Sequence, residues 1–367
     1  MIHNELYDDA IALLCELIRT PSPSREEEET ASLLAKWLAS KGVGDVKRNG
    51  NNIWVNNLHF DPAKPTILLC SHHDTVRPSG AWTRDPFEPA IEEPGESNGG
   101  ARLYGLGSND AGASVVAMAA AFRHFYNHKN LTHNLILALV AEEEISGPGG
   151  LRAVLPELGP ITAAIVGEPT GMQLAVAEKG LMVLDCMAKG RTGHAARDEG
   201  DNAIYHALND IEWFREYRFP RTSPLFGDVK MSVTMIEAGT QHNVVPAECR
   251  FTVDVRVTEQ YSNEEVLDVV RQHVMSVVTP RSLHLRSSSI SPEHFIVRAG
   301  ISLGMSTFGS PTTSDQVVLT APPHPIPSVK LGPGQSSRSH TAGEYIELSE
   351  IEQGINLYIK LLDKIIK

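Results

Sequence analysis

Three short apolar runs constrain the fold of this chain more than any other feature of its sequence. They are TILLC at 66–70, NLILALVA at 134–141 and AAIVG at 163–167. Stretches with helical spacing separate them, such as ASVVAMAAAFRHF at 113–125. Strands that are apolar on both faces are typical of sheets that helices cover on both sides. The alternation therefore predicts an α/β fold with a largely parallel sheet.

The sequence changes character in its middle part. Segments such as GLMVLDCMAKG and ECRFTVDVRV alternate polar and apolar residues, which is typical of strands that bury one face, and helical candidates accompany them at 201–216 and 263–278. An apolar run, PIPSVKLGPG, and a helix at about 348–366 then return to the earlier pattern. We expect a discontinuous α/β domain made of residues 1–178 and 291–367, with an inserted α+β domain at 179–290.

The acidic run Glu26–Glu29 indicates the start of a helix. Ser24 and Glu27 have the spacing of a capping box, and apolar residues follow at helical intervals between 33 and 38. We therefore expect a solvated helix start here, after a first helix from about Glu5 to Arg19.

Charge and composition narrow the classes of function. The chain has 45 acidic and 32 basic residues and a net charge of −13, which disfavours nucleic acids and anionic membranes as partners. No run approaches the roughly 18 to 20 apolar residues of a membrane span, and the first residues lack the features of a signal peptide, so we expect a cytoplasmic protein. The four cysteines show no paired spacing and are predicted to be core residues: Cys15, Cys70, Cys186 and Cys249.

Histidines and carboxylates follow the predicted strands closely. Ligands of open parallel sheets bind at the carboxyl ends of the strands, so these residues are candidates for one site. A lone histidine is more often structural and a glutamate run is more often solvated, but acids directly after a buried strand need a partner or a metal. The candidates are His72, Asp74, Asp110, Glu142, Glu143, Glu144, Glu168 and His340.

This donor set suits borderline divalent cations. Zn²⁺ and Co²⁺ accept histidine nitrogen as well as carboxylate oxygen, whereas Ca²⁺ and Mg²⁺ favour oxygen alone. Two such ions that share a carboxylate lie about 3.5–4 Å apart in dinuclear hydrolases. The residues therefore predict a cofactor of two divalent metal ions, Zn²⁺ or Co²⁺.

Two other classes of protein are alternatives. Glycines at 105, 107 and 112 are a feature of dinucleotide-binding enzymes, but YGLGSNDAG is not G-x-G-x-x-G and would place Asp110 where a pyrophosphate has to lie. A binding protein without catalytic activity on the same fold is the second alternative. A protein of that class would be expected to lack a metal ligand or the general base, whereas this sequence contains every candidate for both.

The order of the motifs resembles the M20 family of metallopeptidases and amidohydrolases. The segment S-H-H-D-T-V is similar to the family signature H-x-D-x-V, with Ser71 where many members have glycine. It is followed in the family's order by YGLGSND-x-G, the acidic triplet, GEPT, GRTGHAA, HNVVP, DVR and H-T-x-x-E, so the resemblance runs from about residue 5 to the C-terminus. It implies a dinuclear catalytic domain, a lid or dimerisation role for 179–290, and a homodimer.

The resemblance also implies a role for each candidate residue. His72 and Glu168 would bind one metal, Glu144 and His340 the other, and Asp110 would bridge them. Asp74 would orient the imidazole of His72, and Glu143 would be the general base, with Glu142 where the family has aspartate. In the insert, His194 would donate to the oxyanion, often in a partner subunit's site, and Asn243 and Arg256 would contact the substrate carboxylate.

Within the family, the chain is similar to acylornithine deacetylases and to the related succinyl-diaminopimelate desuccinylases. The segments FGSPTTSDQ and GPGQSSRSHTAGEY look more like the former. The resemblance thus implies hydrolysis of N-acetyl- or N-succinyl-L-ornithine to ornithine in arginine biosynthesis. The alternatives are succinyl-diaminopimelate desuccinylation and another M20 aminoacylase or dipeptidase. Arg77 would pair with a succinyl carboxylate, or else lie on the surface.

Overall fold

The computed structural model describes residues 2–93, 100–321 and 324–367, which form two compact units. The first unit comprises residues up to Val176, Ile290–Phe308 and Ser314–Lys367. The second comprises Ala177–Ser289 and Gly309–Thr313. Each unit has its own core, and each is described by itself.

The first unit is built on a sheet with the strand order β1-β2-β6-β3-β7-β17-β8. The central strands β6, β3, β7 and β17 run parallel, and β1 and β2 are antiparallel additions at one edge. The expected α/β class with a largely parallel sheet is therefore confirmed. The strands are β1 (Lys47–Asn49), β2 (Asn52–Asn56), β3 (Thr66–His72), β6 (Asn134–Val140), β7 (Ala163–Gly167), β8 (Leu174–Glu178) and β17 (Ser328–Lys330).

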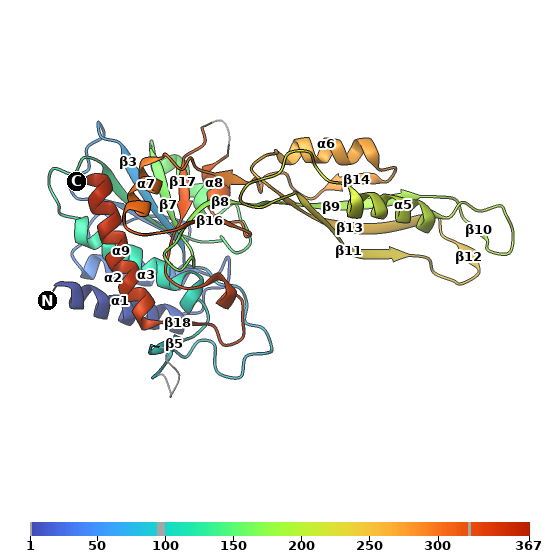
Figure 1. Cartoon of the computed structure of the whole chain (residues 1–367). Coiled ribbons are helices and arrows are strands. Elements are labelled where there is room, and N and C mark those ends of the chain that lie inside the picture. Colours follow the sequence, from blue (N-terminus) through green and yellow to red (C-terminus); the bar gives the residue numbers. More distant parts are fainter. Residues whose placement is uncertain (1, 94–99, 322–323) are drawn as a thin grey trace. The chain divides into compact units, whose positions relative to one another are not determined.

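Helices cover both faces of this sheet (Figure 1). On β3, Ile67 and Leu69 pack into the larger helical layer, whereas Leu68 and Cys70 pack into the smaller one. Burial on both faces explains why the central strands have nearly continuous apolar sequences. The larger layer holds α1 (Ile2–Arg19), α2 (Glu28–Ser40), α3 (Ala113–Phe125), α7 (Phe295–Ser302) and α9 (Leu348–Ile366), and the smaller holds α4 (Leu151–Val154), η2 (Leu155–Glu157) and α8 (Gln316–Leu319).

The predicted capping box at the start of α2 is wrong. The helix begins at Glu28, and its N-cap residue Glu27 makes no side-chain capping bond. Ser24 instead donates a hydrogen bond to Asp74, and the fully buried Glu27 accepts hydrogen bonds from Asn51 and from the main chain of Glu142. Ser24 and Glu27 thus bond to residues that are distant in the sequence rather than to the start of α2. These bonds connect the segment before α2 to the residues that follow β3 and β6.

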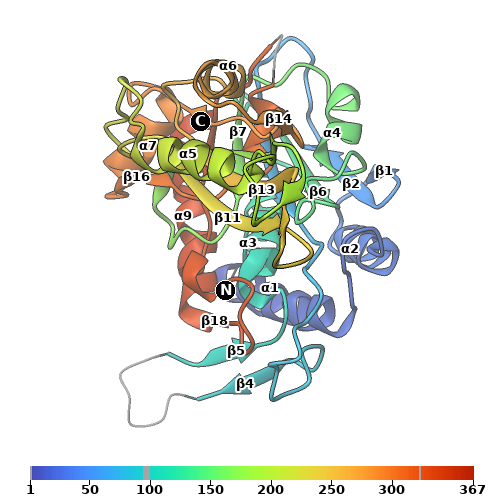
Figure 2. The same ribbon diagram turned by 90° about the vertical axis from the view of Figure 1, so that its right-hand side faces the viewer.

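The first unit also contains a small antiparallel sheet, whose strands are labelled in the lower part of Figure 2. Its strand order is β18-β5-β4, and β18 leads directly into α9. The sheet ties the C-terminal part of the chain to the segment just before Asp110. Its strands are β4 (Ala90–Glu92), β5 (Arg102–Tyr104) and β18 (Tyr345–Glu347).

The second unit is an antiparallel sheet with the order β11-β13-β9-β14. Residues on β9 alternate between buried and more exposed positions, and the buried set packs with α5 (Ala203–Glu216) and α6 (Asn263–His273) in a separate core. The remaining strands include a short pair, β10 (Gly193–His194) and β12 (Val244–Val245). The strands of the four-stranded sheet are β9 (Gly180–Lys189), β11 (Lys230–Ala238), β13 (Glu248–Val257) and β14 (Val277–Pro280). The short strands β15 (Ser288–Ser289) and β16 (Thr307–Ser310) pair with β8 instead.

The second helix of this unit ends earlier than the sequence predicted. We expected a helix over 263–278, but α6 ends at His273 and the chain enters β14 at Val277. The buried Asp210 on α5 accepts hydrogen bonds from the main-chain N–H groups of Met275 and Ser276 and from the Ser276 hydroxyl. These bonds hold the chain extended where the apolar pattern alone would continue the helix.

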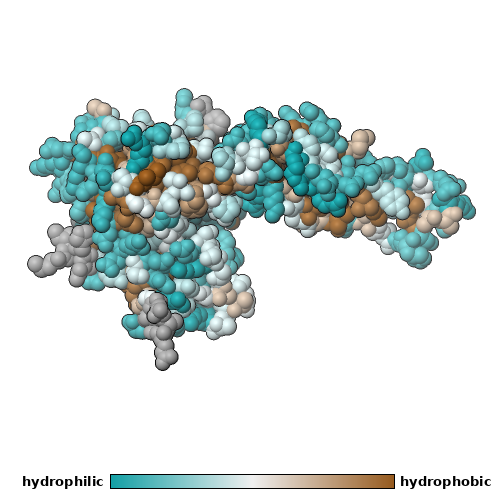
Figure 3. Space-filling model, in the orientation of Figure 1, coloured by the Kyte–Doolittle hydropathy of each residue, from teal (hydrophilic) through white to brown (hydrophobic). Residues whose placement is uncertain are grey.

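The strand β11 lies at an edge of this sheet and exposes apolar side chains. Met235 is 64% exposed and Ile236 is 56% exposed, and Figure 3 shows apolar residues along this part of the unit. Exposed edge strands with apolar side chains are sites where a second strand can pair.

Two further expectations can be compared with the structure. None of the described helices is long and apolar enough to cross a membrane. All four cysteines are free thiols, three of them buried and Cys15 partly buried, so the prediction of core cysteines is confirmed.

Candidate functional site

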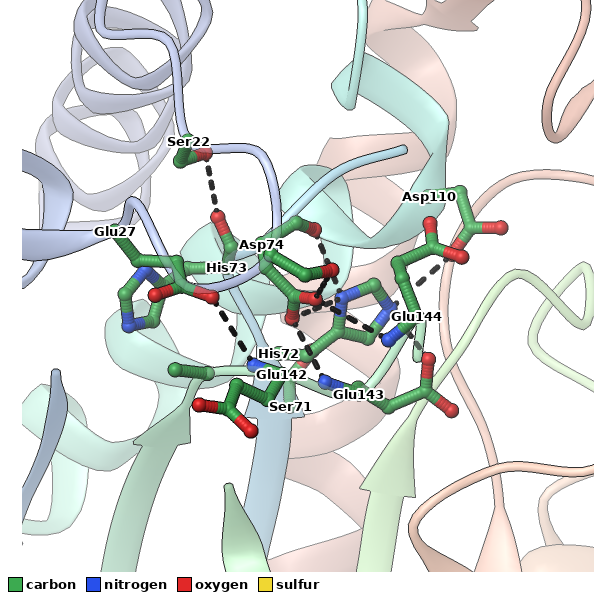
Figure 4. A network of polar contacts seen from close by, with 12 residues as sticks. Ser22, Glu27, Ser71, His72, His73, Asp74, Asp110, Glu142, Glu143 and Glu144 are labelled. Carbon is green, nitrogen blue, oxygen red and sulfur yellow. Dashed lines mark hydrogen bonds and ion pairs between the residues drawn. The ribbon is translucent and has the colours of Figure 1, made fainter. Parts of the chain in front are cut away.

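The carboxyl ends of three adjacent parallel strands form the candidate site (Figure 4). His72 is the last residue of β3, Glu143 and Glu144 follow β6, and Glu168 follows β7. Because β6, β3 and β7 are neighbours with the same direction, their carboxyl ends deliver these side chains to one place. Asp110 comes from the turn before α3.

The first cluster consists of His72, Asp110 and Glu168. The Nε2 atom of His72 lies 3.3 Å from Asp110 Oδ1 and 3.8 Å from Glu168 Oε1. One ligand atom from each residue lies within 4.8 Å of the others, so the three could hold one metal ion.

The second cluster consists of Asp110, Glu144 and His340. The Nε2 atom of His340 lies 2.9 Å from Glu144 Oε2 and 3.6 Å from Asp110 Oδ2. These three residues also meet the 4.8 Å separation of a metal cluster. Asp110 therefore presents one carboxylate oxygen to each cluster, which is the arrangement of a bridging ligand.

Asp74 connects His72 with the acidic triplet. The Nδ1 atom of His72 lies 3.0 Å from the main-chain oxygen of Asp74 and 3.4 Å from its Oδ1 atom. The Asp74 carboxylate also accepts hydrogen bonds from the N–H groups of Glu143 and Glu144, at 3.1 and 3.2 Å, and from Ser24. Asp74 thus orients the imidazole ring of His72 through its main-chain oxygen, with its carboxylate close by, and the carboxylate fixes the backbone of the next two candidates.

Glu142 points away from both clusters. Its φ is 55°, its carboxylate accepts a hydrogen bond from Gly149 N, and its own N–H donates to Glu27. A Cβ atom on Gly149 would lie 2.5 Å from Glu142 Oε1, so a side chain there would displace the Glu142 carboxylate. Of the triplet, Glu143 and Glu144 face the clusters and Glu142 does not.

Glu143 lies beside the first cluster. Its Oε2 atom is 3.9 Å from His72 Nε2, and its side chain is 13% exposed. Burial and the neighbouring Glu168 carboxylate raise the pKa of Glu143 well above its usual value. A carboxyl group in this position could accept a proton from a molecule held next to the clusters.

The chemistry of the donor set fits bound divalent cations. Burial and the nearby Asp110 raise the pKa of Glu168 to about 8, and its Oε1 atom is buried with no hydrogen-bond partner among the described residues. The hydrogen bond to Glu144 raises the pKa of His340 to about 9. Crowded carboxylates with an orphaned oxygen need positive charge, and two cations among these nitrogen and oxygen atoms would supply it.

The remaining predicted residues do not belong to either cluster. His194 and Asn243 are neighbours in the second unit, where β10 pairs with β12 and Ala195 N donates to Asn243 O. Arg256 on β13 forms an ion pair with Asp254 at 2.8 Å. Arg77, in the first unit, is paired with Glu26, and its side chain is 71% exposed.

Sequence reasoning missed three buried carboxyl groups near the clusters. Glu344 is 1% exposed and accepts hydrogen bonds from the turn that carries Asp110; the spacing H-T-x-x-E was the signal for it. Glu27 was interpreted as a helix cap. Asp315, in FGSPTTSDQ, lies next to Cys70, and burial raises its pKa to about 7.

A three-layer α/β unit with two acid and histidine clusters that share one carboxylate is typical of metal-dependent hydrolases. The profile of Peptidase family M20/M25/M40 matches residues 68–364, and the chain belongs to this family. The resemblance stated from the motifs is thereby confirmed, and the chain is an enzyme of the M20 metallopeptidase and amidohydrolase class.

Two curated relatives show what this chain is similar to. It is 28% identical over 308 residues to succinyl-diaminopimelate desuccinylase 2 of Ruegeria sp. (strain TM1040), covering 78% of this chain and 74% of the relative. It is 27% identical over 387 residues to succinyl-diaminopimelate desuccinylase of Stenotrophomonas maltophilia, covering 96% and 98%.

Solved structures share the fold. Aminopeptidase PepT of Bacillus cereus matches with a TM-score of 0.78 at 19% identity, over 98% of each chain. A Bacillus subtilis protein described as a dinuclear metal-binding peptidase of the M20 family matches with a TM-score of 0.73 at 16% identity, over 99% of this chain and 98% of that one.

Proposed function

We propose that this enzyme hydrolyses the amide bond of a small N-acyl amino acid with the help of two divalent metal ions, Zn²⁺ or Co²⁺. The observation that carries the proposal is the shared Asp110 carboxylate, which belongs to both candidate clusters, with Glu143 directly beside them. His72 and Glu168 would hold one ion, and Glu144 and His340 the other.

Two residues of the chain would have separate roles in the hydrolysis. When bound, the two ions would polarise the amide carbonyl and acidify a water molecule. Glu143 would accept the proton of that water and deliver it to the leaving nitrogen, because a carboxyl group with a raised pKa exchanges protons near neutral pH. Asp74 would keep His72 in the tautomer that presents Nε2 to the first cluster.

The second unit would supply groups that contact the substrate. We propose that His194 donates a hydrogen bond to the developing oxyanion, and that Asn243 and Arg256 contact the substrate carboxylate. We also propose a homodimer in which His194 serves the partner subunit. The exposed apolar edge of β11 supports an assembly of this kind, because it offers an unpaired strand to a second copy.

For the substrate, we propose N-acyl-L-ornithine, with an acetyl or succinyl group, in arginine biosynthesis. The segments FGSPTTSDQ and GPGQSSRSHTAGEY support this choice. The names of the curated relatives favour a second candidate, N-succinyl-diaminopimelate, which would place the enzyme in diaminopimelate and lysine biosynthesis instead. Both candidates are small N-acyl amino acids, so the same two-metal chemistry serves either one.

A substrate panel tests these proposals. Metal-free enzyme is reconstituted with Zn²⁺ or Co²⁺ and assayed on the N-acetyl and N-succinyl forms of ornithine, citrulline and diaminopimelate. Preference for an ornithine derivative supports the first candidate, and preference for succinyl-diaminopimelate supports the second. Undiminished hydrolysis after verified removal of all metal would overturn the two-metal proposal, and binding without hydrolysis would show a protein that has lost catalysis.

The role of Arg77 can be tested in the same panel. If it pairs with a succinyl carboxylate, Arg77→Ala should raise KM for succinyl substrates only, and Glu26→Gln should free the guanidinium and lower that KM. Arg84→Ala is the matched control, because Arg84 also pairs with an exposed glutamate in the first unit. Equal effects on acetyl and succinyl substrates would show that Arg77 is a surface residue.

A further inference from the structure

The turn that carries Asp110 is held by a residue that is far away in the sequence. The carboxylate of Glu344 accepts hydrogen bonds from the N–H groups of Asn109 at 2.8 Å, Asp110 at 2.9 Å and Gly107 at 3.2 Å. The main-chain oxygen of Glu344 accepts a fourth, from Gly105 N at 3.1 Å. Four N–H groups within residues 105–110 therefore end on one residue.

The same two segments are also joined in the opposite direction. The side chain of Asn109, which is fully buried, accepts a hydrogen bond from Gln335 N at 2.9 Å and donates to Gln335 O and to Ser339 Oγ. Its oxygen approaches so closely that a Cβ atom on Gly334 would lie 2.4 Å from it. The segment 334–339 leads directly to His340.

These hydrogen bonds lie on both sides of Asp110 and His340, the two residues of the second cluster that come from these segments. Asp110 is adjacent to Asn109 and donates its own N–H to Glu344, while His340 lies between Ser339 and Glu344 in the sequence. Breaking either set of bonds would change the separation between the Asp110 carboxylate and His340 Nε2, now 3.6 Å.

We propose that Glu344 and Asn109 are positioning residues that set the place of Asp110 and His340, so that a second divalent ion can bind and share the Asp110 carboxylate. The inference rests on the proposed two-metal function and deepens it. Side chains that orient metal ligands without touching the metal are commonly worth about 10- to 100-fold in metal affinity. Glu344 has a larger effect than Asn109, because it bonds the backbone of Asp110, a residue of both clusters.

The variant Glu344→Gln tests the role of the carboxylate with the least change of shape. The amide oxygen can still accept from Asn109 N and Asp110 N, but the amide nitrogen is a donor and would face the N–H of Gly107. We therefore expect metal affinity to fall in the order wild type, Glu344→Gln, Glu344→Ala. The control is Glu350→Gln, which removes a carboxylate from the same part of the chain. The Glu350 carboxylate pairs with Arg338 and makes no bond to residues 105–110 among the described contacts.

The measurement is titration of the metal-free full-length protein with Zn²⁺ by calorimetry and with Co²⁺ by visible absorption, alongside thermal unfolding. We expect Glu344→Gln to weaken both metals by about 10- to 100-fold, Asn109→Ala to weaken mainly the second metal, and His340→Ala to abolish the second metal alone. Asn109→Ala also serves if the Glu344 variants do not fold.

Three outcomes would overturn the inference. Wild-type affinity for both metals in Glu344→Gln, or in Asn109→Ala if that is the variant that folds, would show that these bonds serve the fold alone. Equal weakening in Glu350→Gln would show a general loosening of the segment. Wild-type protein that binds fewer than two metals would instead overturn the proposed function, and this inference with it.

Discussion

Loading the metal-free enzyme with two zinc ions at pH 7 should release about two protons from His340 and Glu168, and a further contribution from His72. The hydrogen bond to Glu144 raises the pKa of His340 to about 9, and burial together with Asp110 raises that of Glu168 to about 8. Burial alone would lower the pKa of His72, but the carboxylates of Asp110 and Asp74 raise it well above its usual value. At pH 7 a pKa of about 9 leaves about 1.0 proton on His340, and a pKa of about 8 leaves about 0.9 on Glu168. The raised pKa of His72 favours its protonated form as well, and the metals must displace these protons because only the deprotonated forms are ligands.

Calorimetry in a series of buffers with different ionisation enthalpies measures this release, since the observed heat changes with the buffer in proportion to the protons it takes up. Protons displaced from Glu168 and His72 belong to the first cluster, and the proton displaced from His340 belongs to the second. The apparent affinity of the first site should therefore rise more than about 10-fold per pH unit below pH 8, and that of the second about 10-fold.

Single variants divide the total between the residues. Glu168→Gln should lower the release by about one proton, and His340→Ala should lower it by about one proton and lose one metal. A net release close to zero in the wild type would refute the reasoning, because it would mean that the ligands carry no protons before the metals bind.

Three further predictions concern catalysis, stability and assembly. Glu143→Gln should lower kcat by about 10² to 10⁴ with unchanged metal content, and metal loss in this variant would mean that Glu143 is a ligand rather than the base. In metal-free enzyme, the folded-state pKa values of Glu168 and His340 lie above their unfolded values, so the free energy of unfolding should fall as the pH rises from about 5 to 9; urea titrations that show a rise instead would contradict this. Mixing His194→Ala with Glu143→Gln subunits should restore up to about one quarter of wild-type activity, because half of the dimers are mixed and each has one intact site, whereas a mixture that exchanges subunits yet stays inactive would exclude action of His194 across a dimer.

The sequence predicted the strands of the first unit and the residues at their ends for a specific physical reason. A strand that is buried on both faces has a nearly continuous apolar sequence, so its end is visible as the first charged residue. His72, the acidic triplet 142–144 and Glu168 were found in this way, whereas the choice of Glu143 within the triplet came from the family resemblance. The helices α3 and α9 were found from helical spacing. Because parallel neighbours end at the same edge, the sequence also predicted that these residues would meet.

The predictions for the start of α2 and the end of α6 were wrong because polar residues there bond to partners that are distant in the sequence. Ser24 and Glu27 have the spacing of a helix cap, but they bond to Asp74, Asn51 and the main chain of Glu142. In the second unit, Asp210 holds residues 275 and 276 in an extended conformation. No local pattern reports such bonds, since their partners lie tens of residues away.

Two of the missed carboxylates, Glu344 and Glu27, share one physical role with the predicted Asp74, because each accepts main-chain N–H groups next to the site. Glu344 accepts three N–H groups from the Asp110 turn, Glu27 accepts the N–H of Glu142, and Asp74 accepts those of Glu143 and Glu144. A carboxylate that receives main-chain donors loses less solvation free energy on burial than an unpaired one, and it fixes the backbone that it bonds. Without metal, the protonated imidazoles of His72 and His340 supply positive charge among the ligand carboxylates. The metals then replace protons rather than reorganise the chain, so a variant that breaks an acid-to-backbone bond should change metal affinity more than it changes the fold.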